Sequence, residues 1–370
     1  MSKPRVLYVP MLFATERWNG IMEHLRLLIE GLGDAITPLL VTRPDDGEQT
    51  SILATATGVE TCALGVGRGA GELRRLCRER HIDIVHIQTP VSGGMPRLAV
   101  GGRLGGARVV VTFQQTQLES ASRPRRLLNL ATQRLVLDRC IAVSESVAES
   151  LVTLSGFDRS RIDVVHNAVA PYEEASGARG QALELDDSAV WAGYFGRLAE
   201  EKDVACLLRA LAIASRQEQR LRVLIVGDGY ERDRLLALTT ELSLEGRALF
   251  AGHRSDARAL MRRVAFVVHP PWFEGLPHTL IEALEAGLPI IATRVAGCVE
   301  VVDDGVNGVL VEPRDPEALA AAMVTMAGDP AMRARFSANA LARYARDFSA
   351  DQMVRSVLET YNRVTSGRGR

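Results

Sequence analysis

Short apolar strand patterns alternate with amphipathic helical patterns along this chain, and the alternation runs twice. Strands of the first series are predicted at Arg5–Val9, Thr37–Val41, Ile82–Ile87, Arg108–Phe113, Cys140–Val143 and Asp163–Val165. Helices are predicted between them, at Ile21–Leu32, Glu72–Arg80, Arg125–Leu137 and Glu145–Ser155. Strands separated by helices usually pair in parallel, so this order predicts a doubly wound α/β sheet.

A second series follows a break in the pattern. Residues 171–187 hold a proline, two glycines and five acidic residues, which is typical of a linker. Further strands are then predicted at Val190–Phe195, Arg222–Val226, Ala248–Ala251, Ala265–Val268, Pro289–Thr293 and Val309–Glu312. With 370 residues, the chain is long enough for two domains.

The predicted organisation has four parts. Residues 1–170 form an N-terminal Rossmann-like domain, 171–188 a linker, and 189–348 a C-terminal Rossmann-like domain. Residues 349–370 contain a helix, at about Gln352–Val364, that we expect to pack back on the N-terminal domain. Ligands of open α/β sheets lie outside the carboxyl ends of the strands, so the site is expected in a cleft that the two domains share.

Composition argues against several functional classes. The formal net charge of −1 gives no support to nucleic-acid binding. The five cysteines are scattered without CxxC spacing, and no HxxxH pair occurs, so neither a disulfide framework nor a metal centre on a helix face is predicted. Apolar runs are far shorter than the ~20 residues of a membrane-spanning helix, so we expect a cytoplasmic protein. The oligomeric state has no signal in the sequence.

The segment from Phe266 to Pro289 carries the strongest chemical pattern. A strand is expected to end near His269, and a helix to begin around Pro277, because proline is tolerated at the first helical position. Gly287 then provides a helix stop. The amide groups and the positive dipole end of such a helix form a site for an anion such as a diphosphate.

Two carboxylates flank this predicted anion site. Glu274 lies just before the helix, and Glu282 lies about a turn and a half inside it. Carboxylates beside a phosphate need hydroxyl donors and nearby cations, and a sugar and a ribose supply hydroxyls. The alternative is that Glu282 lies on a solvated helix face.

Cations occur at the matching place after the first strand of the second series. Arg197 and Lys202 would stabilise the charge that grows on a departing diphosphate. Lys3 is the only other lysine among 44 basic residues. No Asp-x-Asp sequence occurs, so we expect no metal ion at the diphosphate and no cofactor.

Together these motifs resemble the retaining glycosyltransferases of family 4, which have the GT-B architecture of two Rossmann-like domains. The resemblance is specific from about Phe195 to Pro313, in Gly-Arg-Leu…Glu-Lys, Val-Gly-Asp-Gly, Ala-Gly-His-Arg and Glu-Gly-Leu-Pro…Glu. It is looser in the N-terminal half, where Asn19-Gly20, Asp83-Ile-Val-His86, Val143-Ser-Glu145 and Asn167-Ala-Val169 carry it.

The resemblance implies a role for each matching residue. The catalytic set would be Arg197 and Lys202 on the diphosphate, with Glu274 on the sugar. The remaining donor-binding residues would be Gly20, Gly196, Arg254, Gly275, Leu276, Pro277, His278 and Glu282, with Glu282 on the ribose and the Gly252–Arg254 loop against the base. Asn19, His86 and Gln114 would lie on the acceptor side. The donor is expected to be a UDP-sugar rather than a GDP-sugar.

Two positions depart from the family pattern. Gln114 stands where the family often has a histidine, and it cannot carry a proton charge at neutral pH. Asp203 follows Lys202 where glycine is common, which puts the conformation of that turn in question.

The acceptor is expected to be a sugar, a glycolipid or a small molecule, and envelope polysaccharide or glycolipid assembly is the commonest family role. Residues 122–139 combine five arginines with Leu127, Leu128, Ala131 and Leu135. This pattern fits an amphipathic helix that touches anionic lipid at the inner face of the membrane, or a site for a phosphorylated acceptor. It also fits a solvated arginine face over a core stripe.

Other functions share parts of this pattern. A nucleotide-sugar epimerase or hydrolase would use the same donor site without an acceptor, and a non-catalytic binding protein would hold the donor without turnover. A phosphorylase with pyridoxal phosphate would need a Schiff-base lysine, for which only Lys202 is available. Tailoring of a small metabolite is a further alternative.

Overall fold

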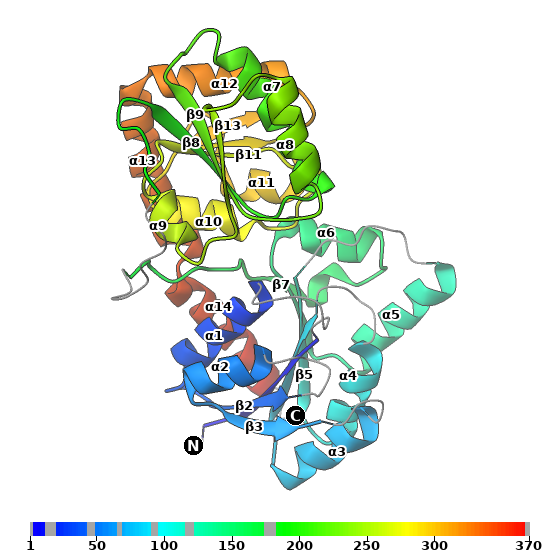
Figure 1. Ribbon diagram of the computed structural model, residues 1–370. Coiled ribbons are helices and arrows are strands. Elements are labelled where there is room, and N and C mark those ends of the chain that lie inside the picture. The colour runs from blue at the N-terminus through cyan, green and yellow to red at the C-terminus, as the bar shows by residue number, and fades with distance from the viewer. Residues whose placement is uncertain are drawn as a thin grey trace. The chain divides into compact units, whose positions relative to one another are not determined.

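The computed structural model describes residues 3–11, 20–42, 49–64, 69–89, 95–114, 122–173 and 183–366. The chain forms two compact units: Met1–Ala170 together with Ser349–Arg370, and Pro171–Phe348. Each unit carries one parallel sheet with helices packed on it (Figure 1). The predicted class, two doubly wound α/β sheets, is confirmed.

The sheet of the first unit has the strand order β3-β2-β1-β4-β5-β6-β7. Its strands are β1 (Arg5–Pro10), β2 (Thr37–Thr42), β3 (Glu60–Ala63), β4 (Ile84–Thr89), β5 (Arg108–Phe113), β6 (Arg139–Ala142) and β7 (Ile162–Val164). The six predicted strands agree with the structure to within two residues. Strand β3 was not predicted, because only one of its four residues is buried and the apolar signal is therefore absent.

The helices of the first unit are α1 (Gly20–Leu32), α2 (Gln49–Thr57), α3 (Gly69–Glu79), α4 (Met95–Leu104), α5 (Arg123–Leu135), α6 (Glu145–Thr153) and α14 (Ala350–Ser366). Two of them were not predicted. Helix α2 is rich in threonine and alanine and lacks a clear apolar stripe. Helix α4 contains Gly101 and Gly102, which lower helix propensity.

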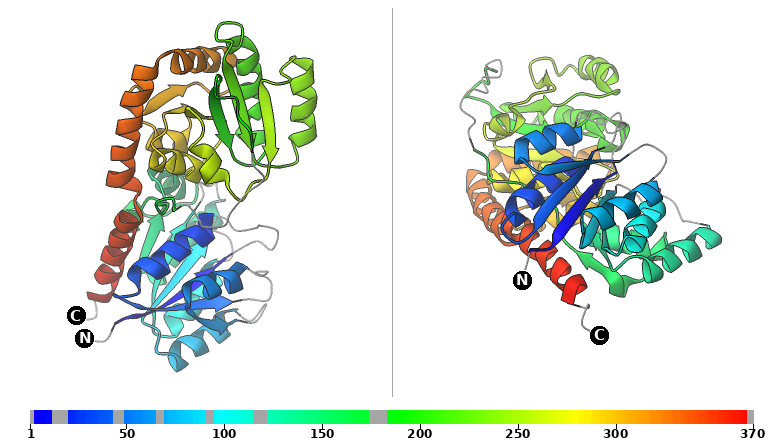
Figure 2. Two further views of the ribbon diagram at one scale, coloured as in Figure 1. Left: turned by 60° about the vertical axis from the view of Figure 1, so that its left-hand side comes forward. Right: turned by 90° about the horizontal axis from the view of Figure 1, so that it is seen from below.

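Helix α14 belongs to the first unit although it lies at the end of the chain. Its buried residues Met353, Val357 and Tyr361 share one apolar cluster with Met22 and Leu25 of α1. Figure 2 shows α14, in red, alongside α1, in blue. Residues from the two ends of the sequence therefore build one core.

The sheet of the second unit has the order β10-β9-β8-β11-β12-β13. Its strands are β8 (Val190–Phe195), β9 (Leu221–Val226), β10 (Ala248–Gly252), β11 (Phe266–His269), β12 (Ile290–Thr293) and β13 (Gly308–Val311). Its helices are α7 (Val204–Ala214), α8 (Arg232–Glu241), α9 (Ala257–Met261), α10 (His278–Glu285), α11 (Ala296–Val301), α12 (Pro316–Gly328) and α13 (Pro330–Arg343). Strands β8 and β11 are neighbours from which the strand order runs in opposite directions. Loops that leave such a switch point are where ligands of α/β sheets bind.

The described ends of the 171–188 stretch are held on the second unit. The Tyr172 backbone N–H donates to Glu285 at 2.9 Å, and the Arg262 guanidinium lies 4.7 Å from the centroid of the Tyr172 ring. Arg263 donates to the Leu183 carbonyl at 2.6 Å. Hydrogen bonds therefore fix the described residues on both sides of 174–182.

Candidate functional site

Two loops meet at the switch point of the second unit and bring two predicted catalytic residues together. Lys202 lies in the loop after β8, in a short 3-10 helix (Glu200–Lys202), and Glu274 lies in the loop after β11. The Lys202 ammonium and the Glu274 carboxylate form an ion pair, with side chains only 17% and 15% exposed. A pair so shielded from water is poorly screened, so its charges act strongly on each other and on a ligand.

The Glu274 carboxylate is held from three directions. Besides Lys202, His269 Nε2 lies 3.2 Å from Oε2, and the Gly275 N–H donates to Oε1 at 3.2 Å. Burial alone would raise the pKa of Glu274, but the bond to His269 and the charge of Lys202 outweigh it and hold the pKa at about 2. The carboxylate is therefore ionised at neutral pH and is a weak base.

His269 and Tyr194 form a buried layer beside this pair, and neither residue was predicted to belong to the site. Their rings stack with centroids 6.3 Å apart, at an interplanar angle of 17°. The Tyr194 hydroxyl donates to the Arg197 carbonyl at 2.8 Å. This layer therefore contacts Glu274 directly and holds the backbone of Arg197, and Lys202 is joined to it through Glu274. In the sequence, the one feature that could have indicated a role for them is position: His269 ends β11, and Tyr194 is the last residue but one of β8.

His269 acts as a neutral donor. Burial lowers the pKa of its imidazole more than the Glu274 carboxylate raises it, so the ring is uncharged at pH 7. Nε2 must then carry the hydrogen that it donates to Glu274, and Nδ1 is buried without a hydrogen-bond partner.

We predict that His269→Leu narrows the pH range of activity on the acid side. Without the imidazole donor, the pKa of Glu274 rises from about 2 toward the ordinary value of 4.5. Glu274 is ionised above its pKa and loses its charge as the pH falls through it, so the acid limb of kcat/KM should move up by about one pH unit. His269→Gln, which can donate from a similar position, should restore the limb. An unchanged limb in His269→Leu would contradict this role.

Trp272, in the loop after β11, is hydrogen-bonded to the loop after β8. Its backbone N–H donates to the Glu201 carbonyl and its indole Nε1 to the Glu200 carbonyl, both at 3.0 Å. Arg314 lies over the indole ring, 5.1 Å from its centroid. The turn that carries Lys202 is thus joined by hydrogen bonds to the loop that carries Glu274.

Asp203 keeps the turn that a glycine would make. Its φ of 47° and ψ of 45° lie in the left-handed region, which aspartate tolerates better than most residues. Its side chain also accepts from the Cys206 N–H at 3.2 Å and caps α7. The departure from the family pattern is therefore compatible with the same turn.

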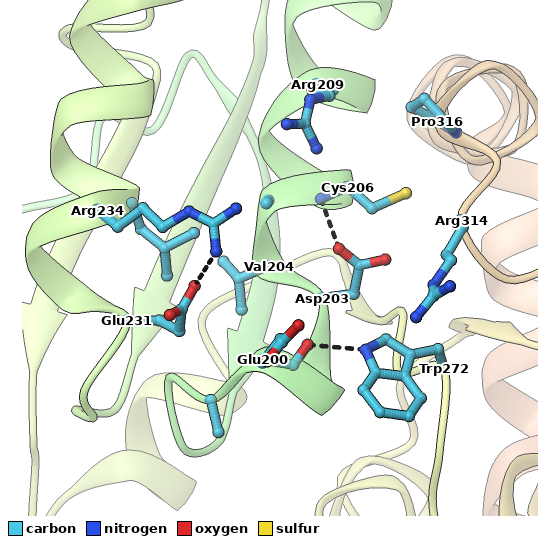
Figure 3. Close-up of a pocket in the computed structure, with 13 residues that line it drawn as sticks. Glu200, Asp203, Val204, Cys206, Arg209, Glu231, Arg234, Trp272, Arg314 and Pro316 are labelled. Atoms are coloured by element: carbon cyan, nitrogen blue, oxygen red, sulfur yellow. Dashed lines mark hydrogen bonds and ion pairs between the residues drawn. The ribbon is translucent and has the colours of Figure 1, made fainter.

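A cavity of about 310 Å³ opens on the other side of this turn (Figure 3). Charged residues of both signs line it: Glu200, Asp203, Arg209, Glu231, Arg234 and Arg314. Arg234 is paired with Glu231 at 2.9 Å. With three residues of each sign, the cavity has no net charge that would select an anion.

Main-chain contacts between loops set the geometry of the switch point. A Cβ on Gly297, at the start of α11, would lie 1.7 Å from the Gly275 carbonyl oxygen. Likewise, a Cβ on Gly227 would lie 1.8 Å from the Gly196 oxygen, and one on Gly229 would lie 2.1 Å from the Leu198 oxygen. Gly196 and Gly275, both predicted donor-binding residues, thus lie against another backbone.

Helix α10 begins one residue later than predicted. Pro277 is its N-cap, with φ −75° and ψ 110°, and its carbonyl accepts from Leu280 at 3.0 Å. Proline has no side-chain acceptor, so the N-cap residue itself makes no capping hydrogen bond. Amides at the start of a helix point outward along its axis, where an anion can bind. Leu276 and Pro277 are buried, whereas His278 and Glu282 are half-buried in the first turns.

Arg197 and Arg254 lie apart from the Lys202–Glu274 pair. The Arg197 side chain is 64% exposed and pairs with Glu201 at 2.7 Å. Arg254 follows the edge strand β10, and its guanidinium binds both carboxylate oxygens of Asp256, at 2.8 and 2.7 Å. Of the predicted cations, only Lys202 touches Glu274 in this structure.

In the first unit, the structure places His86 in the core. The residue is fully buried in β4, with Nδ1 2.6 Å from the Tyr361 hydroxyl and Nε2 2.7 Å from the Thr112 hydroxyl. Burial, with a smaller contribution from the charge of His24, lowers its pKa to about 3. The ring therefore presents no surface to a ligand, and its partners link α14 to the sheet.

Gln114 is also largely buried and bonded at both ends of its amide. It donates to Gln88 at 3.1 Å and accepts from Asn167 at 3.0 Å. An amide can make both bonds without carrying a charge. Asn19 lies outside the described residues, and Gly20 is the first residue of α1.

Metal-binding clusters and membrane-spanning helices are both absent from the described ranges. No three or more His, Cys, Asp or Glu side chains there are grouped so that they could hold a metal ion. No helix in those ranges has both the length and the apolar character needed to cross a membrane.

The sequence matches two family models. Residues 181–343 match the model described as glycosyl transferases group 1, and residues 18–172 match the one described as glycosyltransferase family 4. The D-inositol 3-phosphate glycosyltransferase of Rhodococcus jostii is 32% identical over 322 residues, or 80% of this chain and 70% of that protein. A protein described in the same way from Salinispora tropica is 28% identical over 314 residues, or 77% of this chain and 65% of that protein.

Solved structures share the fold. HepE from Anabaena, crystallised with UDP, matches with a TM-score of 0.82 at 20% identity, over 97% of this chain and 100% of that one. A glycosyltransferase from Rickettsia africae matches with a TM-score of 0.84 at 17% identity, over 100% of both chains. The expected GT-B architecture is thereby confirmed.

Proposed function

The chain belongs to the family 4 glycosyltransferases, and we propose that it transfers a hexose from a UDP-sugar to an acceptor hydroxyl with retention of anomeric configuration. The ion pair between Lys202 and Glu274 is the observation that carries this proposal. At the switch point of the sheet, a cation that can bind a diphosphate lies next to an ionised carboxylate that can bind sugar hydroxyls. UDP is proposed as the carrier because structures of HepE contain UDP with glucose, or UDP-glucose.

Charge stabilisation is the main task of this site in the proposed reaction. As the bond between the sugar and the diphosphate breaks, negative charge grows on the phosphate oxygens, and Lys202 with the amides at the start of α10 would stabilise it. Arg197 would add a second cation once its exposed side chain turns from Glu201. Fixed cations would thus do the work that a metal ion does elsewhere.

The low pKa of Glu274 supports retention. A carboxylate with a pKa of about 2 is a poor proton acceptor at pH 7, so Glu274 is better suited to bind sugar hydroxyls than to deprotonate the acceptor. The departing phosphate is then the proposed base, on the same face of the sugar as the incoming hydroxyl. NMR of the product would show the same anomeric configuration as the donor, and an inverted product would refute this mechanism.

A thermal-shift panel tests the donor class. UDP, GDP and the corresponding glucose, galactose, N-acetylglucosamine and mannose conjugates would each be added with and without a chelator. We expect UDP and one or more UDP-sugars to raise Tm, equally in both conditions. Loss of the shift with the chelator would contradict metal independence. Consumption of the donor without an acceptor would instead favour an epimerase or hydrolase.

Glu282→Ala is predicted to weaken donor binding while leaving the chemical step nearly intact. Loss of a hydrogen bond between a carboxylate and a ribose hydroxyl costs about 1.5–3 kcal/mol, so KM for the donor should rise roughly 10- to 100-fold with little change in kcat. Glu317→Ala is the matched control, because Glu317 is an exposed glutamate in the first turn of α12 in the same unit. A fall in kcat with KM unchanged would reject the assignment.

For the acceptor we propose an envelope polysaccharide or a glycolipid. The relatives described as D-inositol 3-phosphate glycosyltransferases make a phosphorylated cyclitol the second candidate. Transfer from a radiolabelled UDP-sugar to inositol 3-phosphate, and separately to a lipid-linked glycan fraction, distinguishes the two. Label in the aqueous product selects the cyclitol, and label in the organic phase selects the glycolipid.

A further inference from the structure

Helix α5 of the first unit turns its uncharged polar side chains inward and three of its four leucines outward. Asn129, Thr132 and Gln133 are buried, with at most 6% exposure. Leu127, Leu128 and Leu135 are 69%, 52% and 75% exposed. The sequence-based alternative, in which the leucines form a core stripe beneath a solvated arginine face, is therefore wrong.

Hydrogen bonds to one segment of the same unit explain this orientation. Asn129 Nδ2 donates to the Ser155 carbonyl at 3.0 Å, and Gln133 Nε2 donates to the Asp158 carbonyl at 3.1 Å. The Asp158 N–H in turn donates to Gln133 Oε1 at 2.6 Å. Arg126 donates to the Thr153 carbonyl at 2.7 Å. Rotating the leucines inward would leave these buried groups unbonded, so the orientation is specified by the fold.

The outer face of α5 is both apolar and cationic. Leu127, Ala131 and Leu135 follow each other at intervals of four residues and form one stripe, which Leu128 widens. Exposed arginines accompany the stripe at Arg123, Arg125 and Arg134. The helix contains no acidic residue. Exposed leucines seldom cluster on a soluble surface without a partner.

From this surface we infer that α5 docks the protein on an anionic lipid bilayer. Leucines enter the boundary between headgroups and acyl chains, while arginine side chains extend to the phosphates above it. The helix itself holds no acidic residue, so its arginines attract an anionic leaflet. Arg134 also lies 3.7 Å from the Asp158 carboxylate, which leaves Arg123 and Arg125 as the stronger contributors. A second copy of α5 would instead place arginines against arginines, which disfavours a self-association through the same face.

The inference does not depend on the donor site, and its test measures binding rather than transfer. The full chain would be mixed with vesicles of phosphatidylcholine alone, or of phosphatidylcholine and phosphatidylglycerol in roughly equal amounts. The bound fraction would be measured by co-sedimentation. We expect binding to the anionic vesicles only, decreasing with added salt. Equal binding to both vesicle types, or to neither, would overturn the inference.

Variants with matched controls separate the contribution of the leucines to vesicle binding from that of the arginines. Leu127→Ser with Leu128→Ser should reduce anionic-vesicle binding by at least about tenfold, whereas Ile52→Ser, at an exposed isoleucine of α2, should not. Arg123→Gln with Arg134→Gln should weaken binding by about thirtyfold, at about 1 kcal/mol per arginine. The control pair Arg74→Gln with Arg75→Gln, on α3, has the same charge change and should have a smaller effect. Equal losses in test and control variants would reject α5 as the docking surface.

Two further measurements keep the outcome unambiguous. All variants should retain the wild-type Tm shift with UDP, since the altered residues are exposed and lie in the other unit from Lys202. Sedimentation without vesicles reports self-association. If the wild-type chain is a dimer that the two leucine substitutions convert to a monomer, α5 is an interface between copies of the chain and the lipid inference is wrong.

Discussion

Lys202→Ala is expected to lower kcat/KM for glycosyl transfer by about 10³, the largest activity loss of any single substitution considered. The ammonium is the only predicted diphosphate cation that contacts Glu274, and its loss removes charge stabilisation when the leaving group departs. The effect should fall mainly on kcat, because the charge on the diphosphate is greatest in the transition state. Initial rates at saturating and at limiting donor would separate kcat from KM.

A stability effect must be distinguished from this chemical one. Lys202→Ala leaves the Glu274 carboxylate buried without its counter-ion, and breaking such a pair costs roughly 3–5 kcal/mol. The double variant Lys202→Met with Glu274→Gln removes both charges, so it should recover most of the stability and none of the activity. Lys3→Ala, at the other lysine of the chain, should match wild type in both. Near-normal turnover in Lys202→Ala would disprove the site assignment.

Gly297→Ala is expected to destabilise the second unit by about 3 kcal/mol and to lower Tm by about 6–12 °C. The new Cβ would lie 1.7 Å from the Gly275 oxygen and 2.4 Å from its carbonyl carbon, and no side-chain rotation can relieve an overlap with backbone. The loop that carries Glu274 must move, so donor affinity should fall as well. Scanning calorimetry and UDP titration would measure the two effects.

Gly328→Ala is the control for this substitution. Gly328 ends α12 in the same unit, and a Cβ there would meet no atom within 4 Å. Alanine is the better helix former, so this variant should be as stable as wild type or slightly more stable. If Gly297→Ala and Gly328→Ala had the same Tm, the loops would be more deformable than their main-chain contact indicates.

The fold could be predicted where buried strands and helices have a recognisable apolar pattern in the sequence. The central strands of both sheets are mostly apolar runs, and the predicted ranges agree with the structure to within two residues. Strand β3 has no such pattern, because it lies at the edge of its sheet with one buried residue. For helix α5 the predicted range was right and the predicted orientation was wrong. Its apolar stripe is visible in the sequence, but periodicity does not tell which face a helix turns inward. The orientation is set by hydrogen bonds from Asn129 and Gln133 to the Ser155 and Asp158 carbonyls, which lie 26 and 25 residues later in the chain.

The site was predictable in its residue types and not in its contacts. The motifs around Glu274 and Lys202 predicted both residues for the site. Their ion pair joins positions 72 residues apart in the sequence, and it forms because β8 and β11 are neighbours in the sheet. His269 was overlooked because a single histidine at a strand end has no motif. Only its distance of 3.2 Å from Glu274 reveals that it acts on that carboxylate.

The glycine contacts between loops have a consequence for how this protein can evolve. At Gly297 and Gly227 neighbouring loops lie backbone against backbone, so main-chain contacts rather than side chains set the frame of the proposed donor site. Substitutions at the proposed donor-binding positions Leu276 and His278 would therefore leave the main-chain frame of the loops in place. A scaffold fixed by its main chain would let the side chains of such a site change one residue at a time without loss of the loop geometry.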